Sequence, residues 1–552
     1  MSSPTWPAGP AVVVGAGPVG QTTALLLARW GVPTVVLDRR AERDPVGSKA
    51  ICQQRDVLDI WESVGAGARI AREGLTWTTA RTFHRGEELF NYEFAEPGGP
   101  AFPPFVNLSQ TRTEAILDEL IAAEPLVEVR WNHRVTELTQ DARGVTVQCE
   151  TPGGPAVVEA SYVVVCGGAR SEELRGGLGL TFEGKSFDDR FLICDIRADL
   201  PGWADERRFH FDPEWNPGRQ VLIHPCPGST FRIDWQVPAD YDLDAESASG
   251  ALDTRIRRII GDADYEIVWK SVYRFQSRCV DRMRVGRVLL AGDAAHLVAP
   301  FGARGLNSGV ADAENAAWKI AYAGRGWAAE DLLESYHHER HAAARENLAV
   351  TTATMDFFVP QNERQARHRA EILAGAATDA GLRAQVDSGR LAEPFWYVDS
   401  PLTSPNVARP FAGRPPRGEA PTPGPGVLLP DAPVTVDGLA TRIRSLARDG
   451  FLLLATDAAA LAAARSAADA VRGPVRVAAL PDLDTDGVLG EALAARPGEV
   501  WIVRPDGHIA AVVADRHAEE VANALRRAVA QPVITRAIGQ VESIVEQSTA
   551  NR

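Results

Sequence analysis

The first forty residues carry the pattern that most constrains the fold. A short apolar run, AVVV (11–14), leads into GAGPVG (15–20), then a helical run (21–31) and a second apolar run ending in an acid, TVVLD (34–38). In a βαβ unit with this spacing, the first glycine permits a tight turn, the second lets a diphosphate approach the backbone, and the third lets the helix pack closely on the strand. The pattern predicts a Rossmann-type unit that binds a dinucleotide through Gly15, Gly17, Pro18, Val19 and Gly20.

The acid at the end of the second apolar run extends this prediction. Asp38 is followed by Arg39, and an acid at this position can bind the ribose hydroxyls of an adenosine. The fingerprint alone leaves open whether the dinucleotide is FAD or NAD.

A second glycine-rich segment lies far along the chain. AGDAAHLVAPFGARGLNSG (291–309) precedes a strongly helical run, and Asn307 and Ser308 are expected to cap that helix. A helix N-terminus presents N–H groups and a partial positive charge, which suit an anionic part of a ligand. Two well-separated binding segments favour a long cofactor that crosses the protein, as FAD does.

Seven segments together resemble the single-component FAD-dependent aromatic hydroxylases of the phenol, pentachlorophenol and 3-(3-hydroxyphenyl)propionate hydroxylase types. The likeness follows the family order over nearly the whole chain. The segments are GAGPVG with LDRR, GSKAICQQRDVLDIWESVG (47–65), NLSQTRTEAILDEL (107–120), YVVVCGGARSEELR (162–175), GRVLLAGDAAHLVAPFGARGLNSG (286–309), LLESYHHERHAAA (332–344) and VWIVRPDGHIAAVV (500–513).

The resemblance implies roles for single residues. Asp293 is expected to hold a ribityl hydroxyl of FAD, and Pro300 to lie beside the isoalloxazine and the substrate ring. The backbone of residues 305–307 is expected to face the flavin pyrimidine, where a helix N-terminus stabilises the charge of the reduced ring. The remaining cofactor residues implied or predicted are Lys49, Ala50, Gln110, Val135, Gly168, Gly302, Gly305, Leu306 and Asn307.

One position departs from the family pattern. Gly167-Gly168 stands where the family usually has Asp-Gly, and that Asp is associated with both FAD and NAD(P)H. The missing Asp affects the prediction of NAD(P)H as electron donor more than the prediction of FAD binding. The choice between NADH and NADPH stays open.

The expected fold class is α/β, with three units. A discontinuous Rossmann-type FAD-binding domain takes residues 1–180 and 280–360, and an antiparallel β-sheet substrate domain is inserted at 181–279. A helical bridge (345–400) and a linker rich in Pro and Gly (401–434) lead to a thioredoxin-like C-terminal domain at 435–540. That domain has no CxxC, so packing or dimer contact is its expected role, and RPDG (504–507) is expected to be a turn.

Alternating polarity predicts the strands of the inserted sheet, among them RQVLIHPC and TFRIDWQV. Four residues are candidates for activating a phenolic substrate: the carbonyl of Pro300, and His224, Tyr273 and Arg232 on the strands. A general base with a pKa near neutrality favours His224. His296 is expected to make local hydrogen bonds near the cofactor.

The implied reaction is hydroxylation of a phenolic or aromatic substrate with NAD(P)H and O2 through a flavin hydroperoxide. Epoxidation, ring-expanding oxygen insertion and oxidative decarboxylation share every motif and stay open, as does a non-hydroxylating FAD electron-relay protein. An NAD-dependent dehydrogenase is disfavoured, because one GxGxxG occurs and no separate nicotinamide domain is evident.

Composition excludes other classes. The 58 Lys and Arg against 73 Asp and Glu give a net charge of −15, which argues against a nucleic-acid or anionic-membrane partner. The six cysteines form no metal-ligand spacing, so no metal is predicted and reduced thiols are expected. A cytoplasmic enzyme is expected, with a homodimer as one option.

Overall fold

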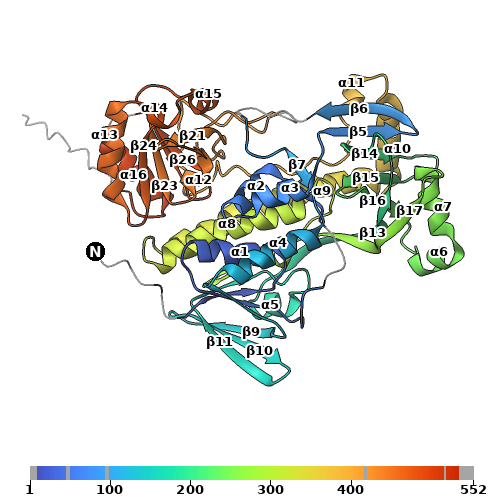
Figure 1. Cartoon of the computed structure of the whole chain (residues 1–552), viewed down its shortest axis with the longest axis horizontal. Coiled ribbons are helices and arrows are strands. Elements are labelled where there is room, and N and C mark those ends of the chain that lie inside the picture. Colours follow the sequence, from blue (N-terminus) through green and yellow to red (C-terminus); the bar gives the residue numbers. More distant parts are fainter. Residues whose placement is uncertain are drawn as a thin grey trace, which may run out of the picture.

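The structure is a computed structural model that describes residue 6 and residues 9–44, 50–93, 99–415, 419–514 and 517–533. Figure 1 shows the C-terminal unit, coloured orange to red, at the left end of the molecule and a large sheet at the right. The nucleotide-binding unit lies between and below them. Among the residues that the structure describes, no helix is both long enough and apolar enough to cross a membrane.

The nucleotide-binding unit is built on a sheet of order β18-β19-β12-β1-β2-β8, parallel except where β18 joins β19. The inner strands are apolar without alternation because a parallel sheet is covered on both faces. The strands are β1 (Ala11–Val14), β2 (Thr34–Leu37), β8 (Val127–Arg130), β12 (Tyr162–Val165), β18 (Arg284–Val285) and β19 (Val288–Leu290).

Helices and two small sheets surround this central sheet. The helices are α1 (Pro18–Arg29), α2 (Arg55–Glu62), α3 (Gly67–Glu73), α4 (Gln110–Ala123), α5 (Glu172–Gly177), α8 (Arg304–Gly324), α9 (Asp331–Phe358) and the short 3-10 helix η1 (Gly292–Ala294). One small sheet has the order β3-β7-β4, with β3 (Cys52–Gln54), β7 (Phe105–Asn107) and β4 (Leu75–Thr76). The other is β11-β10-β9, with β9 (Arg134–Gln140), β10 (Val145–Thr151) and β11 (Gly154–Ala160).

The inserted sheet has the order β20-β17-β13-β16-β15-β14-β5-β6 and is antiparallel except where β14 joins β5. It takes in residues 79–93 from the N-terminal part of the chain, beyond the predicted range 181–279. Its strands are β5 (Thr79–His84), β6 (Glu87–Glu93), β13 (Phe182–Ala198), β14 (Glu206–Phe211), β15 (Gln220–Cys226), β16 (Thr230–Val237), β17 (Tyr265–Val280) and β20 (His296–Leu297). Helices α6 (Leu243–Ser249) and α7 (Ala251–Ile260) follow β16.

The two faces of this sheet differ. One face, with Ile233 and Trp235, forms an apolar cluster with Leu252 and Ile256 of α7. The opposite face packs Phe209 and Leu222 against Ala299 and Phe301 of the second glycine-rich segment. Alternation along each strand therefore directs one set of side chains toward that segment.

The bridge is helical only in its first half, in the end of α9, α10 (Glu363–Gly375) and α11 (Ala380–Arg383). Residues 384–400 lie in irregular backbone, and so do the described residues of the predicted linker up to β21. The C-terminal sheet has the order β24-β23-β25-β26, with β23 and β24 parallel and the other pairs antiparallel. Its strands are β23 (Phe451–Ala455), β24 (Val475–Ala479), β25 (Val500–Val503) and β26 (Ile509–Val513).

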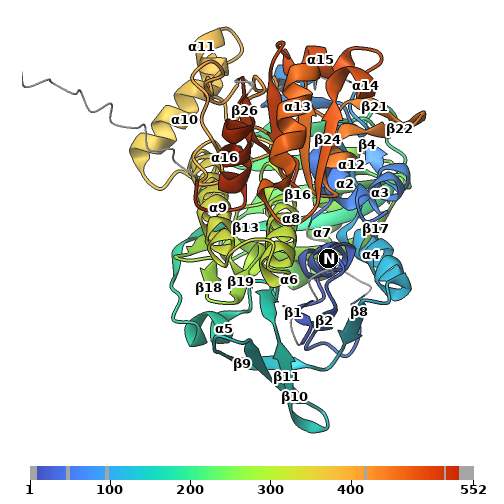
Figure 2. The same ribbon diagram turned by 90° about the vertical axis from the view of Figure 1, so that its left-hand side faces the viewer.

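Helices and a hairpin complete the thioredoxin-like unit: β21 (Pro433–Val436), β22 (Leu439–Arg442), α12 (Ile443–Ala447), α13 (Ala458–Ala467), η2 (Ala468–Ala470), α14 (Leu480–Leu483), α15 (Val488–Leu493) and α16 (Ala518–Ala528). Figure 2 shows this unit above α8 and α9. Trp318 and Tyr322 of α8 share an apolar cluster with Phe451 and Leu453 of β23. The core of the C-terminal unit therefore extends onto the nucleotide-binding unit.

Candidate functional site

The first glycine loop has the geometry that its sequence predicts. Gly15 adopts φ +106°, and a Cβ there would lie 2.6 Å from the carbonyl oxygen of Cys166. At Gly20 a Cβ would lie 1.9 Å from the carbonyl oxygen of Gly15, so the helix and the loop are in close contact. A Cβ at Gly17 would meet no atom within 4 Å. The first and third glycines are thus required by packing, whereas the second faces open space that a diphosphate can occupy.

Asp38 lies at the end of β2, beside this loop. Its carboxylate accepts a hydrogen bond from the N–H of Ala16 (2.8 Å) and pairs with Arg40 (3.0 Å). Burial alone would raise the pKa of Asp38, but the hydrogen bonds from Arg40 and Ala16 outweigh it and the pKa is lowered. An ionised carboxylate therefore stands where the adenosine ribose is predicted to bind. Arg39, the neighbouring prediction, is exposed.

The two glycine-rich segments meet at Val19, in the first turn of α1. A Cβ on Gly309 would lie 2.6 Å from the Val19 side chain, and one on Gly292 would lie 3.0 Å from it. A side chain at either glycine would force these segments apart. The chain therefore brings together the loop before α1, the 3-10 helix η1 and the start of α8. Asp293, the predicted ribityl ligand, lies exposed at this junction.

A buried carboxylate on α8 holds η1 in place. Asp312 accepts hydrogen bonds from the N–H of Gly292 (2.9 Å), from His296 Nε2 (2.7 Å) and from Arg340 Nε (2.6 Å). Burial opposes its ionisation, but Arg340 and His296 lower the pKa of Asp312 to about 2. His296 makes the local hydrogen bond expected of it. Sequence reasoning missed Asp312 and Arg340. Asp312 is a lone acid within a helix and belongs to no motif, whereas Arg340 lies in the quoted segment 332–344, a signal that was not used.

The loop after η1 is held by contacts with residues 390–392. Gly302 has φ +96°, and a Cβ there would lie 2.1 Å from the carbonyl oxygen of Arg390. Ala392 donates its N–H to the carbonyl of Gly302 (2.7 Å), and Arg304 donates to the carbonyl of Arg390 (3.1 Å). Pro300 is exposed, and its carbonyl accepts the N–H of Ala303 (3.0 Å). That carbonyl therefore closes a turn.

The start of α8 differs from the prediction. The helix begins at Arg304 with Ala303 (φ +57°) as its N-cap, so the prediction that Asn307 and Ser308 cap it is wrong. The Asn307 side chain instead accepts the N–H of Gln54 (3.0 Å) and donates to the carbonyl of Cys52 (3.0 Å), which docks β3 onto α8. Gly305, Leu306 and Asn307 lie in the first turn, where backbone N–H groups point out of the helix end.

Further predicted cofactor residues border the same region. Gln110 begins α4, and its side-chain oxygen accepts the N–H of Ala50 (3.3 Å). Val135 lies in β9, two residues after His133, whose N–H bonds to the carbonyl of Asp38 (2.8 Å). This places Val135 near the predicted adenosine end. Lys49 lies outside the described residues.

The Gly167-Gly168 segment is tied to η1 by an arginine. Gly168 has φ +74° and a Cβ there would meet no atom within 4 Å. Arg175 donates to the carbonyl of Ala169 (3.0 Å) and to that of Ala294 (3.1 Å). Arg175 is a positioning residue that joins two segments at the cofactor edge, and its place in the quoted segment was a signal that went unused.

Three of the four candidate catalytic residues share one face of the inserted sheet. Arg232 is opposite both Asp195 and His224 in register, and Tyr273 is opposite Phe191. Residues opposite one another in adjacent strands point to the same side of the sheet. Phe191 and Phe209 contact the Phe301 ring, with centroids 5.1 and 6.4 Å apart. This face therefore covers the loop that carries Pro300.

The structure corrects the expectation for His224. Burial, with Arg207 and Arg232 nearby, lowers the pKa of His224 well below its ordinary value. His224 is neutral at physiological pH and is not a base with a pKa near 7. Arg232 forms a buried bidentate pair with Asp195 (2.7 and 2.8 Å) and is a fixed positive charge.

Asp234 lies on the same face as Arg232, two residues along β16, and sequence reasoning missed it. Its Oδ1 atom is buried without a hydrogen-bond partner. Burial raises the pKa of Asp234 to about 7, and Asp195 acts in the same direction, whereas Arg232 and Arg207 oppose it. No sequence signal distinguishes this acid from others on strands.

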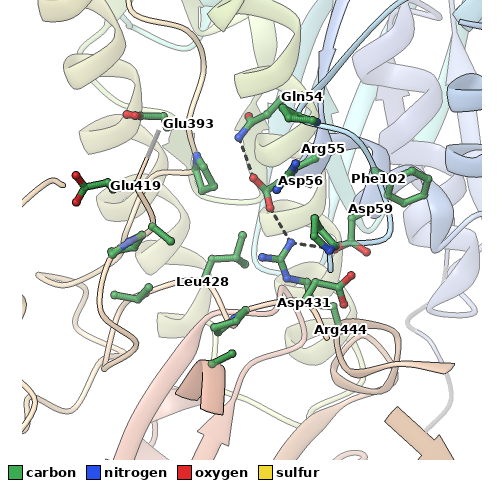
Figure 3. A pocket seen from close by; sticks show the side chains of 18 of the residues that line it. Gln54, Arg55, Asp56, Asp59, Phe102, Glu393, Glu419, Leu428, Asp431 and Arg444 are labelled. Carbon is green, nitrogen blue, oxygen red and sulfur yellow. Dashed lines mark hydrogen bonds and ion pairs between the residues drawn. The ribbon is translucent and has the colours of Figure 1, made fainter. Parts of the chain in front are cut away.

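A cavity of about 580 Å³ lies elsewhere, between α2, residues 390–396, residues 419–431 and the C-terminal unit. Figure 3 shows Arg444 of the C-terminal unit paired with Asp56 of α2 (2.6 Å) at its wall. Its described lining includes none of the predicted cofactor or catalytic residues. The residues at the junction of the two glycine loops, with an ionised Asp38 and an open backbone at Gly17, fit FAD.

Comparisons with known proteins identify the family of the chain. A family model described as "FAD binding domain" matches residues 9–351, and one described as "Aromatic-ring hydroxylase, C-terminal" matches residues 422–532. A 3-(3-hydroxy-phenyl)propionate/3-hydroxycinnamic acid hydroxylase of Mycobacterium sp. (strain KMS) is 32% identical over 384 residues, which are 68% of this chain. The chain spans 64% of the length of that relative.

Two further similar proteins cover different shares of the chain. A para-nitrophenol 4-monooxygenase of Pseudomonas sp. (strain WBC-3) is 29% identical over 68% of this chain and 93% of its own length. The structure of the anhydrotetracycline hydroxylase OxyS from Streptomyces rimosus aligns with a TM-score of 0.69 and 26% identity over 95% of this chain and 99% of that one.

Proposed function

Because the chain belongs to the FAD-binding domain family and carries an aromatic-ring hydroxylase C-terminal domain, we propose that it is a monooxygenase that hydroxylates a phenolic ring. FAD is its cofactor, NADH or NADPH its electron donor, and O2 its second substrate. The activity and the substrate are part of this proposal, because the alignment covers only 64% of the length of the hydroxyphenylpropionate hydroxylase.

One observation carries the proposal. The loop before α1, η1 and the start of α8 converge on Val19, and the inserted sheet packs against Phe301 in the loop that follows η1. This arrangement provides a cradle for a dinucleotide and, beside it, an apolar and aromatic sheet face against which a substrate ring can pack. A protein that only relays electrons needs the cradle but has no use for such a face.

Bound FAD supplies the redox chemistry and the activation of oxygen. The chain supplies position, charge and dryness. The first turn of α8 presents N–H groups and a partial positive charge toward the ring that is to carry negative charge. Phe191, Phe209 and Phe301 keep water from the sheet face. Asp312 fixes the backbone of Gly292, next to the predicted ribityl ligand Asp293.

The size of the substrate is a separate question within the proposal. The names of the two sequence relatives state 3-(3-hydroxy-phenyl)propionate, 3-hydroxycinnamic acid and para-nitrophenol, each with one ring. The OxyS alignment spans nearly the full chain, and that name states anhydrotetracycline. A test panel must therefore include single-ring phenols and polycyclic phenols. We expect one class to stimulate turnover strongly.

The deciding experiment is NADH and NADPH oxidation by the FAD-loaded protein with that panel. We expect one phenol to raise the rate many-fold and to yield a product heavier by one oxygen atom. Oxidation that no phenol stimulates, or a product without added oxygen, would contradict the proposal. The Asp188→Asn variant should give the same stimulation and product as the wild type, because Asp188 is exposed on β13 and pairs only with Arg274 in the described structure.

A cytoplasmic location belongs to the same proposal, and all six cysteines are buried free thiols. A homodimer stays a prediction that the molar mass in solution would check.

A further inference from the structure

We propose that Asp234 is the catalytic base that takes the proton of the substrate's phenolic hydroxyl group, and that Arg232 and Arg207 stabilise the phenolate that remains. The inference rests on the proposed function, because it assigns a residue to that function's substrate. His224, the base favoured by sequence, is then a neutral neighbour of Arg232.

The position of Asp234 follows from strand register. Asp234 is opposite Leu222 of β15 and Ile193 of β13. Leu222 belongs to the apolar cluster that contains Ala299 and Phe301. These two residues lie on either side of Pro300, beside which the substrate ring is expected. Asp234 thus points from the sheet toward the place where a phenol is expected to lie.

The carboxylate of Asp234 can accept a hydrogen bond from a ligand. Oδ1 of Asp234 is buried without a hydrogen-bond partner, although a buried carboxylate oxygen normally accepts at least one hydrogen bond. The residue keeps partial exposure despite its depth in the protein. A phenolic O–H that reached this carboxylate would supply the missing donor.

The charges around Asp234 favour the transfer. Arg232 and Arg207 are the cationic groups that act on it, and Asp195 is the anionic one, itself paired with Arg232. The histidine and cysteine side chains nearby on β13 and β15 are neutral: His224 has a strongly lowered pKa, and burial raises the pKa of Cys194 and of Cys226 to about 12. Phe301 and Ala299, from the opposing loop, are uncharged.

The step balances without a redox change. The phenolic O–H bond breaks, its proton forms an O–H bond on the carboxylate of Asp234, and the electron pair stays on the phenolate oxygen. One negative charge thus moves from Asp234 to the substrate, still beside Arg232 and Arg207. A carboxyl group whose pKa is raised to about 7 is a stronger base than an ordinary aspartate and is still largely ionised slightly above neutral pH.

The first test measures the protonation of the Asp234 carboxyl group and needs no turnover. Infrared difference spectra of the FAD-loaded protein, wild type minus Asp234→Asn, are recorded across pH 4 to 9. We expect the carbonyl band of a protonated carboxyl group to disappear with a midpoint near pH 7. Absence of the band above about pH 5, the range in which an ordinary aspartate has already ionised, would overturn the proposal.

The second test reads a bound phenol. The probe is phenol, whose hydroxyl is neutral in free solution at pH 7.5 because its pKa, like that of tyrosine, is about 10. Its phenolate absorbs at longer wavelength than the neutral form and is measured as a difference spectrum against the FAD-loaded protein. We expect the bound probe to be phenolate in the wild type at pH 7.5, and the phenolate fraction to fall severalfold in Asp234→Asn. Asp234→Glu should restore it. An unchanged phenolate fraction in Asp234→Asn would overturn the proposal, and if the probe does not bind, the infrared titration alone decides.

The controls separate this inference from the proposed function. Asp188→Asn makes the same chemical change at an exposed site on β13 and should alter neither readout. Circular dichroism and FAD affinity show whether Asp234→Asn is folded, and a misfolded variant is replaced by Asp234→Leu, which also cannot ionise. A wild type that binds phenols as phenolates and hydroxylates none of them would contradict the proposed function alone.

Discussion

The carboxylate of Asp312 on α8 accepts the backbone N–H of Gly292 at 2.9 Å, and this bond joins the 3-10 helix η1 to the interior of α8. Gly292 precedes the predicted ribityl ligand Asp293, whereas Asp312 lies two turns into the helix whose first turn is expected to face the flavin. The same carboxylate binds His296 and Arg340. Asp312 thus sets the position of η1 relative to α8.

Replacing Asp312 by Asn should therefore weaken both stability and FAD binding. Arg340 would remain buried without its ionised partner, and breaking a buried pair in this way costs about 3–5 kcal/mol. We expect a lower Tm and FAD affinity reduced by about tenfold, or 1.4 kcal/mol. Thermal unfolding of the apoprotein and quenching of flavin fluorescence measure the two effects. Asp331→Asn, at an exposed position of α9, is the control, and equal FAD affinity in both variants would contradict the role of Asp312.

Two glycine variants in the first loop should separate binding from folding. Gly17→Ala places its Cβ where no protein atom lies within 4 Å, so stability should fall by about 1 kcal/mol or less. FAD affinity should fall at least about tenfold, because the methyl group occupies the space that the diphosphate needs.

Gly20→Ala is the contrasting change. Its Cβ would lie 1.9 Å from the carbonyl oxygen of Gly15, so the loop must shift and stability should fall by about 1–3 kcal/mol or more. Thermal unfolding without FAD and flavin titration give both quantities for each variant. If Gly17→Ala were the less stable of the two and bound FAD normally, the dinucleotide site would lie elsewhere.

Local patterns predicted the elements better than they predicted the contacts between them. GAGPVG and its flanking apolar runs place β1, α1 and β2 correctly, because steric demands on Gly15 and Gly20 arise within about ten residues of chain. Alternating polarity predicted β13, β14, β15, β16 and β17 of the inserted sheet, whereas β5, β6 and β20 come from outside the predicted range. The start of α8 was misplaced, since Asn307 uses its side chain to hold β3, a contact with a distant segment.

The chemistry of the sheet face shows the same limit. Residue type and predicted strand were enough to select His224 and Arg232, but the pKa of His224 depends on its depth and on Arg207 from another strand. Asp234 resembles any aspartate on a strand until its neighbours are known. Register across four strands decides which of these groups meet, and one sequence carries no direct record of register.

The C-terminal unit should stabilise the nucleotide-binding unit through Arg448. This buried arginine bonds Asp59 of α2 and Glu314 of α8, each at 2.8 Å. Arg448→Met would leave Glu314 without its cation and Asp59 with only its longer contact to Arg444 (3.4 Å), and breaking a buried pair in this way costs about 3–5 kcal/mol. We expect one cooperative unfolding transition to move to lower temperature or to split in two, measured by calorimetry. Arg465→Met, exposed on α13, should leave the transition unchanged; a shift of equal size in both variants would remove the case for docking through Arg448.

Asp234 should make the protein less stable as pH rises through the acid range. The unfolded chain releases this proton near pH 3.8, whereas the folded chain retains it to about pH 7. Between these values the folded state binds more protons than the unfolded state, so the free energy of unfolding falls with increasing pH. Asp234→Asn cannot ionise and escapes this loss. The Tm difference, Asp234→Asn minus wild type, should therefore grow from pH 4 to pH 7 and then level off.

The pH trend of that difference is the diagnostic quantity. His224 contributes the opposite slope, because its lowered pKa makes the folded state bind fewer protons than the unfolded state below pH 6.5, but it is present in both proteins and cancels. Asp234→Leu also cannot ionise, so its Tm difference from the wild type should show the same dependence on pH even if its absolute Tm differs. That dependence arises only from the loss of the ionisable group at position 234. Differential scanning calorimetry of the apoproteins at half-unit pH intervals is the measurement. A Tm difference that stayed constant from pH 4 to pH 8 in both variants would mean that Asp234 titrates alike in the folded and unfolded chains, and a base with that property could not hold a phenolic proton near neutral pH.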